Sequence, residues 1–216
     1  MASPYLKAAL LTAALVFLGF FFISQLDAMR ANELRANVEE LLFQSEAERM
    51  LFTYSQLMSN DTNEICIYLS TAAETKASQA YALSEKIRYY EQSNLANADY
   101  ERIRNQYYLS NMGLYLNIRA AEKYCKGTPY DTVLFFYKLK EDCPECRAQG
   151  GVLDKLRQAR PSLRVFAFPY DTNLQFINVF VKRHGISQVP SLVINDRDVL
   201  LGLKNEEEVA AHLRKG

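Results

Sequence analysis

Hydrophobic positions along this chain fall into three successive patterns, and each pattern predicts a different kind of structure. An uncharged apolar run extends from Ala8 to Leu26. Between residues 28 and 127, apolar residues recur at steps of three and four, which is typical of helices that pack on each other. From about Thr128, short apolar runs alternate with helical patterns, which predicts strands and helices in alternation.

The N-terminal apolar run is about long enough to cross the hydrocarbon core of a membrane as one helix. A cleavable signal peptide is the alternative, since Lys7 precedes the run, but the run is long for a signal and no convincing small-residue cleavage site follows it. We therefore expect residues 1–27 to form a single-pass transmembrane anchor. Lys7 favours a cytoplasmic N-terminus and Arg30 and Arg35 oppose it, so charge alone leaves the orientation open.

Residues 28–127 are expected to form an all-α domain of three helices. Polar clusters at residues 59–63 and 93–97 divide this region into segments, and no proline interrupts it. The second segment has the most regular seam, running from Leu69 to Tyr90. Such spacing describes antiparallel or coiled-coil-like packing, so this domain could also join two copies of the chain into a homo-oligomer or present a substrate.

Cys66 and Cys125 lie almost equally far on either side of Leu95, which is the centre of the second polar cluster. If the second and third helices form a hairpin about that cluster, antiparallel packing brings both cysteines to the same level at its open end. We therefore predict a structural disulfide between Cys66 and Cys125. Two free buried thiols are the alternative.

Residues 128–216 are expected to follow the order βαβαββα. The apolar runs predict four strands and the intervening amphipathic stretches predict three helices. The predicted strands are Val133–Lys138, Leu163–Phe168, Ser191–Ile194 and Val199–Leu201, and the predicted helices are Glu145–Ala159, Leu174–His184 and Glu206–Arg214, the last of them capped by Asn205.

The motif Cys143-Pro144-Glu145-Cys146 stands between the first of these strands and the first of these helices. A cysteine at a helix N-terminus gains from unpaired N–H groups and the positive end of the helix dipole, which stabilise a thiolate. Proline suits the first helical turn, where its missing N–H is not needed. Cys146 lies one turn deeper, where it could resolve a mixed disulfide from inside.

Zinc sites use the same cysteine spacing, so metal binding is an alternative for this motif. A zinc site would need two more ligands, and His184 and His212 are the only histidines in the sequence. His184 directly precedes Gly185 and fits the end of a helix better than a ligand position. We therefore predict no metal and no cofactor.

Together with Val189-Pro190 before the third strand, this motif makes the C-terminal part of the chain resemble the thioredoxin-like superfamily. The resemblance covers well under half of the chain. It implies a mixed four-stranded sheet flanked by helices, and thiol–disulfide exchange with Cys143 as the attacking thiol and Cys146 as the resolving thiol. It also implies that Pro190 is a cis-proline facing the disulfide, and that the main chain of Val189 pairs with an extended substrate.

The sequence departs from the pattern of that superfamily around the motif. No tryptophan precedes Cys143, and the flank reads Lys140-Glu141-Asp142. Tyr137 lies where thioredoxins carry a buried acid. Because acidic neighbours oppose a thiolate and basic ones favour it, the sequence leaves open whether the motif oxidises, reduces or isomerises.

The 216 residues carry a formal net charge of zero, which gives no reason to expect nucleic acid as a partner. Stable disulfides belong mainly to oxidising compartments, so we expect the residues after about Asp27 to lie outside the cytoplasm. The sequence thus predicts a membrane-anchored thiol–disulfide oxidoreductase that acts on protein thiols or disulfides together with a redox partner protein. A non-enzymatic thioredoxin-like binding or assembly module with a structural CxxC disulfide is the alternative.

Overall fold

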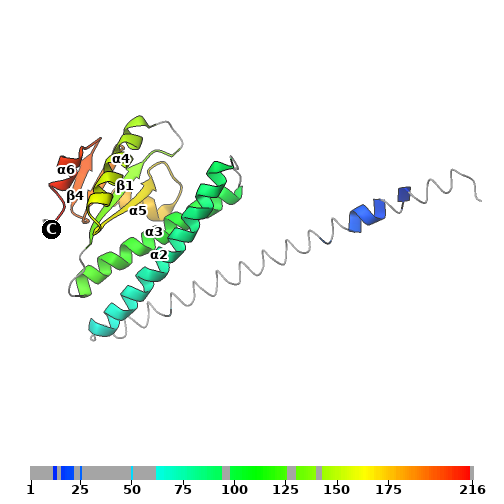
Figure 1. Ribbon diagram of the computed structural model, residues 1–216, viewed down its shortest axis with the longest axis horizontal. Helices are drawn as coiled ribbons and strands as arrows, with labels where there is room; N and C mark the ends of the chain where they lie inside the picture. Colours follow the sequence, from blue (N-terminus) through cyan, green and yellow to red (C-terminus); the bar gives the residue numbers. More distant parts are fainter. Residues whose placement is uncertain are drawn as a thin grey trace, which may run out of the picture. The chain divides into compact units, whose positions relative to one another are not determined.

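The computed structural model describes residues 12–13, 16–21, 25, 50, 62–93, 98–125, 130–139 and 143–214. The chain divides into two compact units, Met1–Met58 and Ser59–Gly216. The elements of the second unit (Figure 1) are, in chain order, α2 (Thr62–Gln92), α3 (Ala98–Tyr124), β1 (Asp131–Tyr137), α4 (Pro144–Ala159), β2 (Leu163–Pro169), α5 (Gln175–Arg183), β3 (Ser191–Ile194), β4 (Asp198–Leu201) and α6 (Glu206–Ala210).

Strand β1 lies inside a mixed four-stranded sheet of order β2-β1-β3-β4. It pairs in parallel with β2 and antiparallel with β3, and β4 continues the sheet antiparallel to β3. Val133, Leu134 and Phe136 are 0% exposed, so neither face of β1 meets solvent. An unbroken apolar run is the sequence pattern of such a strand, because both rows of its alternating side chains must be buried.

Helices cover both faces of the sheet. On one face, α3 and α5 pack on the sheet through Tyr108, Met112, Tyr115, Ile118 and Ile177, which meet Leu134, Phe136, Phe166, Phe168 and Val193. On the other face, α4 and the segment around α6 pack on the sheet. Their buried residues Cys146, Leu153, Leu156, Val209 and Leu213 form one cluster with Val133, Phe135, Leu192 and Ile194 of the strands. Each face therefore has its own apolar core.

Helix α2 packs along α3 as the other arm of a hairpin (Figure 1). Gly113 on α3 faces the aliphatic chain of Lys76 on α2, and a Cβ added at Gly113 would lie 3.3 Å from the Lys76 Cε. Lys76 is the residue that interrupts the apolar seam of α2. Its methylene groups fill the space left by the missing side chain of Gly113.

The fold class expected from the sequence is wrong, because it set a transmembrane helix before the helical region and the sheet. Within the described part of the chain, no helix is both long and apolar enough to cross a membrane. Helices α2 and α3 have 31 and 27 residues, but charged side chains recur along both. Of the predicted three-helix region, the described residues contain these two. The predicted first helix at residues 30–58 lies almost entirely outside the described residues, and the domain boundaries at 27 and 127 stay predictions.

Asp196, in the turn between β3 and β4, ties three elements together. Its carboxylate accepts a hydrogen bond from the Tyr115 hydroxyl of α3 at 3.1 Å and pairs with Arg183 of α5 at 2.6 Å. The Nε2 of His184, whose side chain is 7% exposed, lies 3.1 Å from the same carboxylate.

Burial lowers the pKa of His184, and this effect outweighs the opposing attraction of Asp196. His184 therefore holds its neutral form more strongly in the folded protein than in the unfolded chain.

The lowered pKa of His184 predicts how stability changes with pH. Because the folded pKa lies below the unfolded one, the contribution of His184 is present above about pH 6.5 and is lost as the pH falls through the folded value. The free energy of unfolding, measured by urea titration between about pH 7.5 and pH 5, should fall less steeply in His184→Gln than in the natural protein. A variant with an unchanged slope would show that His184 is not the group responsible.

Candidate functional site

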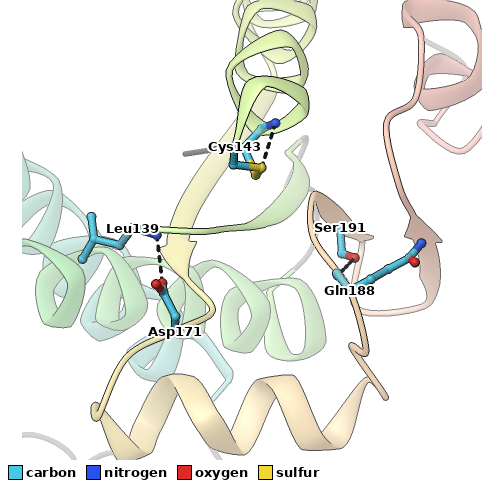
Figure 2. Close-up of a disulfide and its surroundings, with 6 residues drawn as sticks. Leu139, Cys143, Asp171, Gln188 and Ser191 are labelled. Atoms are coloured by element: carbon cyan, nitrogen blue, oxygen red, sulfur yellow. Dashed lines mark hydrogen bonds between the residues drawn. A yellow bond between two sulfur atoms is a disulfide. The ribbon is translucent and has the colours of Figure 1, made fainter. Parts of the chain in front are cut away.

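The chain leaves β1 toward the CxxC motif along a path fixed by hydrogen bonds to the segment after β2. The Tyr170 N–H donates to the Tyr137 carbonyl at 2.7 Å, and the Leu139 N–H donates to Asp171 Oδ1 at 2.8 Å. Figure 2 shows Asp171 directed at the main chain of Leu139. The parallel pairing of β1 with β2 is thereby continued beyond both strands. The flanking residues 140–142 lie outside the described residues.

Cys143 and Cys146 form a disulfide at the first turn of α4, with an S–S distance of 2.05 Å. Cys143 is the N-cap residue of α4 and Pro144 follows at its first position. The Cys143 Sγ accepts a hydrogen bond from the Cys146 N–H at 3.2 Å (Figure 2). This contact satisfies one of the N–H groups that a helix start leaves without an intrahelical partner.

The two sulfur-bearing residues differ in exposure. Cys146 is 6% exposed and belongs to the core cluster beneath α4, whereas Cys143 is only partly buried and lies at the edge of that cluster. Cys143 is therefore the more accessible of the two residues to a thiolate arriving from solvent.

The Val189-Pro190 peptide bond is cis and directly precedes β3. Since Ser191 pairs with Phe136, this segment lies at the same end of β1 from which the chain departs toward Cys143. Val189 also packs against the cluster that contains Cys143 and Cys146. The structure therefore brings the four residues of the predicted active site to one end of the sheet.

Neighbouring main-chain groups hold this segment in place. The Pro190 carbonyl accepts from the Gly202 N–H at 2.9 Å, and the Ser191 hydroxyl donates to the Gln188 carbonyl at 2.5 Å (Figure 2). Within the described part of the chain, no hydrogen bond involves the main chain of Val189. Its N–H and carbonyl are thus available to a further strand.

Tyr137, in the place where an acid was expected from the resemblance, is joined to α3. Its hydroxyl and that of Tyr108 lie 2.8 Å apart, and its ring packs at the edge of the cluster containing the disulfide. Burial raises the pKa of both phenols, so both remain protonated at neutral pH. The sequence gives no sign of this pair, because the two residues belong to different predicted domains.

Cys66 and Cys125 are joined by a second disulfide, with Cα atoms 5.6 Å apart. It links the start of α2 to the end of α3, at the open end of the hairpin. Cys125 precedes β1 and Cys143 follows it, so the whole of strand β1 lies between the two disulfides along the chain. Its structural role stays a prediction.

The arrangement of the described side chains bears on the metal alternative, and comparisons with known proteins bear on ancestry. Among the described residues, no group of three His, Cys, Asp or Glu side chains is placed to hold a metal ion. No protein-family model matches the chain, and no curated protein matches its sequence.

Removing the Cys66–Cys125 disulfide should destabilise the protein strongly, because it closes a loop with a sequence separation of 59 residues. The chain-entropy model gives a loss of about 4 kcal/mol for Cys66→Ala/Cys125→Ala. The matched control is Cys143→Ala/Cys146→Ala, which opens a far shorter loop and should cost about half as much on the same model. Urea unfolding under non-reducing conditions measures both, and equal losses would contradict the prediction.

Proposed function

We propose that this protein is a thiol–disulfide oxidoreductase whose redox centre is Cys143–Cys146. The observation that carries the proposal is the unequal burial of the two cysteines at the start of α4, with Val189 and Pro190 at the same end of the sheet. A structural disulfide gains nothing from such an arrangement. An exchange reaction needs one sulfur that substrate can reach and one that it cannot.

The exchange proceeds in two balanced steps from the oxidised form. A substrate thiolate attacks the Cys143 sulfur, so that a mixed disulfide forms and Cys146 departs as a thiolate. A second substrate thiolate then attacks the substrate sulfur of the mixed disulfide, which releases Cys143 as a thiolate. The substrate loses two electrons and gains a disulfide, and the protein gains both electrons as a dithiol. The reverse sequence reduces a substrate disulfide.

A protein segment in extended conformation is the substrate we propose. The unpaired main chain of Val189 can form hydrogen bonds with such a segment, which gives affinity without demanding a particular side-chain sequence. A second redox protein then returns Cys143–Cys146 to its starting state. Because two disulfides are formed by the four cysteines, we propose an oxidising compartment as the place of action.

This proposal is consistent with the thioredoxin-like resemblance of the motifs, which stays a prediction. The rival function is a binding or assembly module in which Cys143–Cys146 is structural. The two differ in reduction potential, since structural disulfides typically lie below about −300 mV.

The exposed position of Cys143 predicts which single-cysteine variant captures a substrate. With an unfolded protein that carries disulfides as substrate, the full chain with Cys146→Ser should accumulate a mixed disulfide, because no internal thiol can release it. The matched control Cys143→Ser should accumulate none, since the remaining thiol is buried. Non-reducing electrophoresis detects the adduct, and mass mapping must place it on Cys143.

The natural protein should also equilibrate with glutathione at a potential above about −300 mV and turn over an insulin-type substrate. A potential below that value, together with no turnover and no captured adduct, would contradict the proposed activity and favour a structural role for the Cys143–Cys146 disulfide.

A further inference from the structure

Gln149 is a polar residue on the buried face of α4, and it is 0% exposed. The other buried residues of that helix are Cys146, Leu153 and Leu156, so the amide lies in otherwise apolar surroundings. Burying an amide costs free energy unless its donors and acceptors are paired. The hydrogen-bond partners of the Gln149 amide therefore indicate the role of this side chain.

One end of the amide has a partner and the other has none. Oε1 accepts a hydrogen bond from the Lys204 N–H at 2.7 Å. Since a main-chain N–H can only donate, this contact identifies the oxygen and leaves Nε2 facing another direction. Among the residues that the structure describes, the buried Nε2 has no hydrogen-bond partner. The donor is thus in place without a partner in the oxidised protein.

The amide lies next to Cys146. Residues three apart on a helix are neighbours on one face, and helical side chains lean toward the N-terminus, so Gln149 lies over the turn that holds Cys146. The opposite side is bounded by the segment of Lys204, which comes shortly after Gly202, the hydrogen-bond partner of Pro190. Gln149 therefore lies on the buried face of α4 that carries Cys146, and its amide oxygen is bound to the segment that follows Gly202.

We propose that Nε2 of Gln149 donates a hydrogen bond to the Cys146 sulfur when the disulfide is reduced. This rests on the proposed function, because it concerns the reduced state through which exchange passes. A disulfide sulfur is a weak acceptor, whereas a thiolate is a strong one, and hydrogen bonds to charged groups are the stronger class. Cys146 is shielded from water, so a donor from the protein takes the place of solvent in stabilising its reduced form.

The test is the equilibrium of the full chain with glutathione. Two glutathione thiols become one glutathione disulfide, while the Cys143–Cys146 bond breaks and its sulfurs take up the two electrons. One of the two protons goes to Cys143 and the other to solvent, because Cys146 is held as a thiolate. Gln149→Met keeps the size of the side chain and removes the donor. We expect the equilibrium to shift about tenfold toward the protein disulfide, which is about 30 mV to more negative potential.

Leu153→Met is the matched control, since Leu153 shares the buried face of α4 one turn further on and has no polar group. Its potential should equal that of the natural protein. If Gln149 only holds Lys204 in place, Gln149→Met lowers the melting temperature equally in both redox states. If the proposed hydrogen bond forms, Gln149→Met lowers the melting temperature more in the reduced protein.

A measurement on the natural protein covers the case in which Gln149→Met does not fold. The side-chain amide resonance of Gln149 should shift, and its protons should exchange more slowly with solvent, when the disulfide is reduced. An unchanged amide resonance of Gln149 would overturn the proposal. So would a shift of the glutathione equilibrium by less than about threefold in Gln149→Met. These readouts are equilibrium properties, so a lack of turnover would count against the proposed function and not against the hydrogen bond.

Discussion

Strand β1 must bury both of its faces, and the placement of the other elements follows from that constraint. The run Val133–Phe136 has no polar side chain, so it is stable only between two layers that exclude water. Its parallel partner β2 cannot be reached by a tight turn, because parallel strands need a crossover. Helix α4 is that crossover, and it covers one face of the strand. The point where the chain leaves β1 and starts α4 is therefore also where Cys143 gains a helix N-terminus and an open side.

The other face of β1 is covered in large part by α3, which belongs to the region preceding the sheet in the sequence. Tyr108, Met112 and Tyr115 are between 1% and 3% exposed there, so α3 is a core element of the same unit as the sheet. Tyr108 also meets Tyr137 at the disulfide end of β1. Helix α3 thus supports the candidate site directly. A role as a mere spacer would not require such burial.

Local sequence signals located the elements after residue 130 well, since apolar runs, prolines and caps act over a few residues. Asn205, for example, forms a capping box with Glu208 at the start of α6. These short-range sequence patterns did not predict features that depend on contacts between residues far apart in the sequence. Helix α6 ends at Ala210 rather than Arg214; the chain continues beyond it in tighter turns, and the Arg214 N–H donates to Asp131 at the start of β1. The sequence predicted that α3 packs on another helix, which it does, but not that it also packs on the sheet, because Tyr108 and Tyr115 could face either kind of element.

The candidate site shows the same division between local and distant effects. The spacing of Cys143 and Cys146 was readable because it is built into one helical turn. Gln149 was not singled out, because a polar residue in an amphipathic helix is expected to face solvent, and only the closure of the Lys204 segment over it makes it buried. As a result, each sulfur has its own kind of environment: Cys143 meets solvent and a helix N–H, and Cys146 meets only protein groups. The acidic side chain of Glu145 is exposed, so water screens its charge. We therefore expect the balance between dithiol and disulfide to depend more on hydrogen-bond donors near the two sulfurs than on the charge of Glu145.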